Sequence, residues 1–449
     1  MNTGENMKNI LTYLIVIGFL STIFAQKDLL QSGPMVGYSQ MREAALWVQT
    51  SEPAYVYFEY WDKEKPDEKF YTYSVNTDPH IYHMTTLIAD QVEPGITYEY
   101  KLYINDEPIE LDYRTEFQTQ KLWQWREDPP EFTFGIGSCA YINETVYDRP
   151  GEPYGGDHHI FKTIYEKDPD FFIWMGDNSY LREADWHSRT GIYKRLTNDR
   201  SLPLLQPMLG SIHHYATWDD HDYGPNNSDR SFWAKDITRE AFVNWWANPS
   251  YGVPGAEESI ATYFEWADCA FFLMDDRTYR TPENRTQVKK EMLGRDQIEW
   301  LLDALSSSSA PFKFVVIGST VLNPEPIGEN YSNFPEEKKY LLDMIEKENI
   351  EGGIFLTGDI HRGELTRIKR DDNYPLFEIT SSPLSAGVSS YDTNKARVEG
   401  TLVQERNFAL LSIKGPRKNR TLTITMFNAD GDEKWSHTVN EKELQNDRE

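Results

Sequence analysis

Alternating apolar and polar positions dominate residues 27 to about 120. Short segments rich in Tyr, Phe, Val and Thr recur there at nearly regular spacing: AALWVQT, AYVYFEYW, KFYTYSV, YHMTTLIA and YEYKLYIND. A period of two residues is typical of strands that bury one face. The phrase VEPGITYEYKLYIN has the strand–turn–strand pattern of immunoglobulin-like sandwiches. We therefore expect an all-β Ig/fibronectin-III-like domain over residues 27–120.

The pattern changes after a Pro-containing linker at residues 121–131. Apolar runs that end in Gly, Ser or Asp now alternate with segments of helical periodicity, such as RDQIEWLLDALSSSS and EEKKYLLDMIEKEN. This alternation indicates an α/β domain. Strand-like runs return after about residue 400. We expect one catalytic unit over residues 132–440, layered as α/β/β/α or α/β/α and closed by the C-terminal strands.

The first 25 residues resemble an export signal. Lys8 precedes an apolar stretch, and Ala25 stands before Gln26 as a cleavage site. The apolar core is about a dozen residues long, which is short for a membrane span. An uncleaved anchor is the alternative. We expect a cleaved signal peptide at residues 1–25, a secreted or periplasmic protein and no stable membrane span.

The charge balance narrows the partners. The 449 residues carry a formal net charge of −27, which argues against a nucleic-acid partner because phosphate backbones are neutralised by Lys and Arg. An acidic chain suits hard cations, and bound metal ions would reverse the local field for an anionic substrate. The two cysteines, Cys139 and Cys269, are too few for a disulfide framework.

Polar side chains recur where the predicted strands end. In open α/β sheets, sites form at the carboxyl ends of strands. Carboxylates suit hard ions, whereas His, Cys and Tyr suit iron or zinc. Each motif alone also fits a turn, a cap or a buried thiol, but together they predict an oxygen-rich metal site. Its members are Cys139 in GSCAY, Asp177 and Tyr180 in GDNSY, Asp219 to Asp222 in WDDHDYGPNN, and Asp359 and His361 in TGDIH.

The motifs GSC, PDFFIWMGDNSY, WDDHDYGPNN, LMDDRTYR, MLGRDQIEWL and LTGDIH, in this order, resemble the alkaline phosphatase D (PhoD-like) metallophosphatases. The resemblance implies a calcineurin-like four-layer α/β/β/α fold and phosphoester hydrolysis. It also implies Fe3+ and Ca2+ as cofactors, with Zn2+ less expected. By the same resemblance Cys139 and Tyr180 bind iron, Asp177 bridges metals, and Asp220, Asn226, Asp359 and His361 complete the metal ligands.

The expected reaction is in-line attack of a metal-activated water on the phosphorus of a small phosphoester. Asp177, Asp220 and His221 form the expected catalytic set, with His221 assisting the leaving group or binding phosphate. Hydrolysis of phosphodiesters, as by a phospholipase D-like enzyme, is an alternative on the same site. A calcium-binding adhesion module without catalysis is an alternative of another class. The oligomeric state is left open.

Overall fold

The computed structural model describes residues 29–326, 328–371, 373–391 and 394–446. The predicted signal peptide at residues 1–25 lies outside this part of the chain. Within it, no helix has the length and apolar character needed to cross a membrane.

The N-terminal unit consists of two β-sheets that enclose a shared core. One sheet has the order β1–β2–β6, and the other is built on the antiparallel pair β3 and β7 with four short strands at its edges. Alternate residues of β3 and β7, such as Phe58 and Tyr100, point into the core between the sheets. The strands are β1 (Leu30–Ser39), β2 (Ala44–Thr50), β3 (Tyr55–Asp62), β4 (Phe70–Tyr71), β5 (Val75–Asn76), β6 (Met84–Ala89), β7 (Thr97–Ile104), β8 (Glu107–Pro108) and β9 (Glu116–Gln118).

Two six-stranded mixed sheets follow. The first has the order β12–β11–β10–β19–β20–β21 and the second β13–β14–β15–β16–β18–β17. The first comprises β10 (Phe132–Gly137), β11 (Phe171–Met175), β12 (His213–Thr217), β19 (Asn407–Lys414), β20 (Thr421–Asn428) and β21 (Glu433–Asn440). The second comprises β13 (Thr262–Trp266), β14 (Cys269–Leu273), β15 (Lys313–Ile317), β16 (Gly353–Thr357), β17 (Glu364–Ile368) and β18 (Leu376–Thr380).

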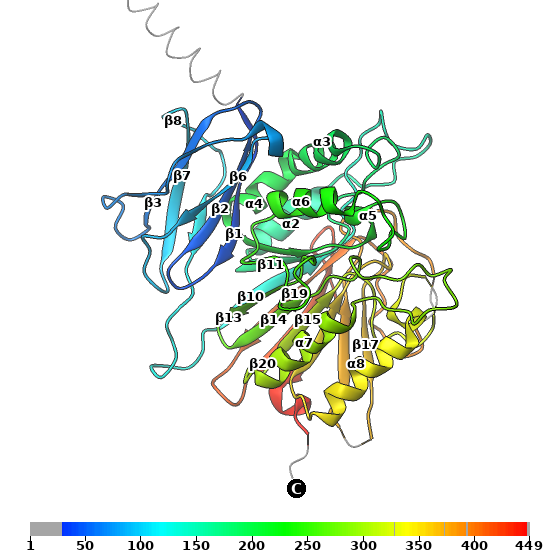
Figure 1. Cartoon of the computed structure of the whole chain (residues 1–449). Helices are drawn as coiled ribbons and strands as arrows, with labels where there is room; N and C mark the ends of the chain where they lie inside the picture. The colour runs from blue at the N-terminus through cyan, green and yellow to red at the C-terminus, as the bar shows by residue number, and fades with distance from the viewer. Residues whose placement is uncertain (1–28, 327, 372, 392–393, 447–449) are drawn as a thin grey trace, which may run out of the picture.

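The two sheets pack against each other and carry helices on their other faces (Figure 1). Between the sheets, the ring of Phe134 lies 5.2 Å from that of Phe271. On the far face of the second sheet, Phe272 contacts Trp300 of α7 (Arg295–Ser307), next to α8 (Pro335–Lys347). Phe172 and Trp174 of the first sheet pack in one core with α2 (His159–Lys167), α3 (Arg189–Arg200), α4 (Gln206–Ser211) and α6 (Lys235–Trp245). The predicted α/β fold is confirmed.

The N-terminal unit packs on the outer helices of the first sheet. The guanidinium of Arg200, at the end of α3, is buried among the rings of Trp47 from β2 and of Trp245 and Trp246 at the end of α6. On β12, the His213 ring joins two backbone groups of the N-terminal unit. Figure 1 shows the blue strands of this unit beside α3, α4 and α6.

Candidate metal centre

The centre forms where parallel strands of both sheets end. Cys139 follows β10, Asp177 follows β11, Asp219 and Asp220 follow β12, and Asp359 follows β16. The pairs β10–β11, β11–β12 and β15–β16 are parallel, so their carboxyl ends meet at one edge.

The backbone is strained at this edge. Cys139, Asp177, Asp359 and His361 all have left-handed φ values between 54° and 65°, which is uncommon for residues other than glycine and clusters at functional sites. Gly176, with φ of 89°, makes the turn before Asp177. A Cβ there would lie 2.9 Å from backbone atoms of Trp218 and Asp219. Only glycine lets these two strand ends approach so closely.

The first group of close ligand atoms contains sulfur, nitrogen and oxygen. The Cys139 thiol, a carboxylate oxygen of Asp177 and a ring nitrogen of His361 lie within 4.8 Å of one another. The Tyr180 hydroxyl donates to Asp177 Oδ2 at 2.9 Å and lies 3.2 Å from His361 Nε2. The structure therefore brings together four of the predicted ligands from three strand ends.

The second group shares Asp177 with the first. Ligand atoms of Asp177, Asp220 and His221 lie within 4.8 Å of one another. The backbone N–H of His221 donates to Asp177 Oδ1 at 3.2 Å, while the Tyr180 hydroxyl uses Oδ2. Asp177 thus faces the two groups with different oxygens.

The short helix α5 (Asp220–Tyr223) holds the second group in place. Its N-cap, Asp219, forms a capping box with Asp222. Asp222 Oδ1 also accepts the backbone N–H groups of Asn178 and Ser179 at 2.9 and 3.1 Å. Asp222 therefore joins the loops after β11 and β12, and its carboxylate is occupied by backbone donors.

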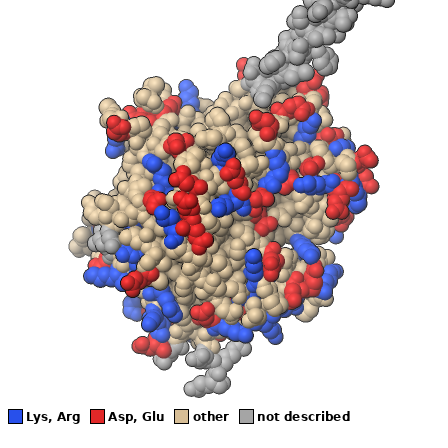
Figure 2. All heavy atoms as spheres, turned by 180° about the vertical axis from the view of Figure 1, so that it is seen from behind, with Lys and Arg blue, Asp and Glu red and all other residues tan. Residues whose placement is uncertain are grey.

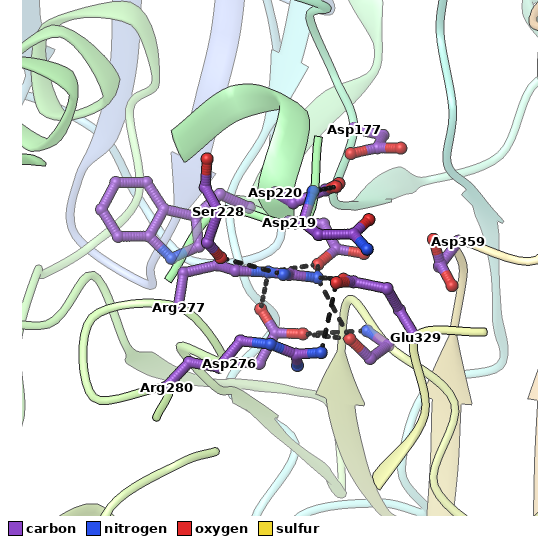
Figure 3. Close-up of polar contacts among 12 residues, drawn as sticks. Asp177, Asp219, Asp220, Ser228, Asp276, Arg277, Arg280, Glu329 and Asp359 are labelled. Carbon is purple, nitrogen blue, oxygen red and sulfur yellow. Dashed lines mark hydrogen bonds and ion pairs between the residues drawn. The ribbon is translucent and has the colours of Figure 1, made fainter. Parts of the chain in front are cut away.

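A third acidic group is already neutralised by an arginine. Ligand atoms of Asp219, Asp220 and Glu329 lie within 4.8 Å of one another, but the fully buried guanidinium of Arg277 is hydrogen-bonded to both Asp219 and Glu329. Figure 3 shows Arg277 lying between them, apart from Asp177 and Asp359. This group is best explained as a buried ion-pair network that packs next to Asp220.

The electrostatics of the centre favour bound cations. Burial and the nearby Asp359 charge raise the pKa of the Cys139 thiol to about 11. Burial, then the charges of Asp220 and Cys139, raise the pKa of Asp177 well above its ordinary value. Burial lowers the pKa of both His221 and His361, which leaves their rings neutral at pH 7. Anionic ligands that resist ionisation without a partner, next to neutral imidazoles, are typical of a metal site.

Buried oxygens without hydrogen-bond partners also favour bound cations. Oδ1 of Asp220, Oδ2 of Asp219 and Oδ1 of Asn178 are buried and have no hydrogen-bond partner among the described residues. Such groups are costly unless an ion or ordered water satisfies them. The donor set thus fits bound metal ions.

Two predicted ligands lie apart from these groups. Asn226 is exposed, and its amide donates to the side chain of Asn227. Asp359 is in none of the three groups of close ligand atoms. Its carbonyl oxygen lies 3.7 Å from the Cys139 thiol, and burial, with Glu329 and Asp220, raises the pKa of its side chain to about 8.

Sequence reasoning missed Glu329 as a member of this edge. It lies in the segment between β15 and α8, among Gly, Pro and Asn residues that give no periodic signal. Only the preceding LMDDRTYR motif, which contains Arg277, marks the network that Glu329 joins.

Comparisons with known proteins agree with this geometry. The model of the family described as PhoD-like phosphatase matches residues 134–415, and a domain of unknown function, DUF7800, matches residues 27–122. Alkaline phosphatase D of Bacillus subtilis (strain 168) is 22% identical over 349 residues, covering 68% of this chain. The chain spans 57% of the length of that curated relative.

A solved structure titled "Structure of PhoD" superposes with a TM-score of 0.73 at 15% identity, covering 92% of both chains. This similarity concerns the fold. Because the family model spans more than half of the chain, the sequence and the strand-end centre lead to one conclusion: the protein belongs to the PhoD-like phosphatase family.

Proposed function

We propose that this protein is a metal-dependent phosphoester hydrolase that acts on small phosphomonoesters, phosphodiesters or both. The observation that carries the proposal is the position of Asp177, whose two oxygens face two adjoining groups of ligand atoms. Paired cation sites of this kind suit the hydrolysis of phosphate esters.

The two groups differ in chemistry, which supports different metals. Cys139, Tyr180 and His361 supply sulfur, phenol and imidazole donors, which suit iron, and the family resemblance makes Zn2+ the less expected occupant. Asp220 and Asp177 supply oxygen donors that suit Ca2+. When bound, the cations would withdraw charge from the phosphoryl oxygens and lower the pKa of water at the centre.

The chain's own residues would orient the substrate. His221 has a neutral ring, so it offers one N–H donor and one lone pair. Its ring lies 4.2 Å from that of Tyr180, centroid to centroid, which restricts its orientation. We assign His221 a hydrogen bond to the substrate that favours departure of the leaving oxygen.

The test combines metal analysis of the purified protein with hydrolysis of p-nitrophenyl phosphate and bis(p-nitrophenyl) phosphate. We expect iron and calcium together with release of nitrophenolate, and the ratio of the two rates gives the preferred ester class. The variant Asp177→Asn should lose nearly all turnover, whereas Asp90→Asn, an exposed control, should retain it. Wild-type turnover in Asp177→Asn would refute the assignment of the centre. Calcium binding without any turnover would favour a binding module.

We further propose that the arrangement of the two central sheets and their helices is the four-layer α/β/β/α sandwich of calcineurin-like phosphoesterases. The N-terminal unit would be an Ig/fibronectin-III-like domain. Export after cleavage of residues 1–25 would place the protein in the periplasm or the medium, and Edman sequencing of the exported protein should then begin at Gln26. The face shown in Figure 2 intersperses acidic and basic side chains, and the formal net charge of −27 favours a small substrate over nucleic acid.

A further inference from the structure

A pocket adjoins the metal centre on the side of Asn227. It has a volume of about 430 Å3, and its lining includes Asn227, Arg280, Asn284 and Arg285. This volume accommodates a small polar group.

Two contacts join this pocket to Asp220 of the metal centre. The backbone N–H of Asn227 donates to Asp220 Oδ2 at 2.5 Å. Arg280 lies 3.3 Å from Glu329, and a Glu329 oxygen lies within 4.8 Å of a ligand atom of Asp220. Through these contacts the lining of the pocket is connected to Asp220, which places the pocket beside the metal centre.

Two guanidinium groups and two carboxylates line the pocket, and one guanidinium is left unpaired within the described chain. Glu283 pairs with Arg280 at 3.1 Å, and Asp229 accepts the Ser231 N–H at 2.8 Å. The exposed guanidinium of Arg285 forms no hydrogen bond or ion pair with any described residue. Nη1 of the buried Arg280 also lacks a hydrogen-bond partner in the described part of the chain.

The segment around the pocket is basic, although the molecule as a whole is acidic. Residues 280–290 contain four basic residues and one acidic residue, in a chain whose net charge is −27. Guanidinium groups bind phosphate and carboxylate oxygens through paired hydrogen bonds, and the amides of Asn227 and Asn284 offer further donors.

We propose that this pocket is a subsite for a second anionic group on the substrate, such as a phosphate separated by a short linker from the reacting one. The inference rests on the proposed hydrolase function and narrows its substrate class to esters with at least two anionic groups.

The experiment uses p-nitrophenyl phosphate hydrolysis by the full-length, metal-loaded protein as a reporter. The competitors are straight-chain α,ω-alkanediol bisphosphates of three to six carbons and the monophosphates of the same diols. We expect the best bisphosphate to have an inhibition constant about tenfold lower than its monophosphate, as an added Arg–phosphate contact allows. An optimum in chain length would measure the distance between the two anion sites.

Arg285→Ala should remove most of this preference, and Arg285→Lys should restore part of it. The matched control is Lys289→Ala, which removes the same charge from an exposed position of the same segment that does not line the pocket. It should keep the wild-type preference if the contact is local rather than a long-range field effect.

Normal reporter hydrolysis with equal inhibition by both competitor classes would overturn the subsite and leave the hydrolase function standing. An equal loss of preference in Arg285→Ala and Lys289→Ala would also overturn it, in favour of general electrostatic attraction. Absence of reporter hydrolysis in the wild type, with metals bound, would instead contradict the proposed function.

Discussion

At the scale of single residues, Gly176 decides whether the strand ends of β11 and β12 can meet. Gly176→Ala should destabilise the fold by about 1–3 kcal/mol from backbone strain alone, and by more because its Cβ would meet backbone atoms at 2.9 Å. Gly400→Ala is the matched control: Gly400 has a similar φ of 82° but open space around its Cβ. Urea unfolding of both variants separates strain from steric clash. Equal losses would show that the close approach is unimportant.

Asp177 illustrates how a site residue opposes stability until its cation binds. Burial raises its pKa in the folded state above the unfolded value, so its ionised form destabilises the metal-free fold at neutral pH. That penalty disappears as the pH falls below the unfolded pKa of about 4. We expect metal-free Asp177→Asn to have a higher melting temperature than the wild type at pH 8, with the difference shrinking toward pH 4.

Added metal should reverse this order of melting temperatures. The wild type should gain stability from iron and calcium, whereas Asp177→Asn should gain little. Equal gains would mean that the cations bind elsewhere.

At the scale of elements, the period of apolar residues predicts which face of a strand or helix is buried. The prediction fails where the buried residues do not follow a regular period or are charged. Strands β2, β3 and β7 and helices α7 and α8 follow from the sequence pattern. β1 does not, because LQSGPMVGYS contains Gly33 and Pro34 and pairs with β2 through register shifts. α3 was also missed, because it buries charged side chains: Arg195 pairs there with Asp185 and Glu144 from other segments.

The same limit applies to the metal centre. Cys139, Asp177, Tyr180 and His361 could be predicted because they lie in the short segments that follow apolar strands. The roles of Glu329 and Arg277 depend on which loops meet across the two sheets, and that is a property of the tertiary fold.

Strand β12 contains a histidine whose protonation opposes packing of the N-terminal unit. His213 Nδ1 lies 2.7 Å from the Gly37 carbonyl and acts as donor, while Nε2 accepts the Gln118 N–H at 3.0 Å. The neutral ring thus satisfies both partners, and a proton on Nε2 would break the bond from Gln118. Burial lowers the pKa of His213 to about 4. The unfolded chain binds this proton near pH 6.5, so stability is lost as pH falls from about 6.5 toward 4, by about 2 kcal/mol at pH 5.

The measurement is the free energy of urea unfolding at pH 7 and pH 5. His213→Asn should lower stability at pH 7 but reduce its dependence on pH in this range. The exposed His187→Asn should leave that dependence unchanged. A wild-type pH dependence in His213→Asn would assign the acid sensitivity to other groups.

At the scale of the whole molecule, the two units are joined around Arg200 rather than merely connected by a linker. Its guanidinium lies 4.3 Å from the ring centres of both Trp245 and Trp246 and 5.0 Å from that of Trp47. Burial lowers the pKa of Arg200 well below its usual value, and no ion pair with a described carboxylate offsets this cost. The side chain therefore contributes through packing and contacts with the aromatic rings, against an unfavourable buried charge.

This balance predicts different effects for two substitutions. Arg200→Ala should leave a cavity between the units and destabilise the protein by about 2–5 kcal/mol, by analogy with other large-to-small changes in a core. Arg200→Met fills much of the same volume without a charge, and its stability should lie within about 1 kcal/mol of the wild type. Urea unfolding followed by tryptophan fluorescence measures both, because three tryptophans report on this junction. If Arg200→Met is as unstable as Arg200→Ala, the charge on the rings, rather than packing, holds the N-terminal unit against the domain that forms the metal centre.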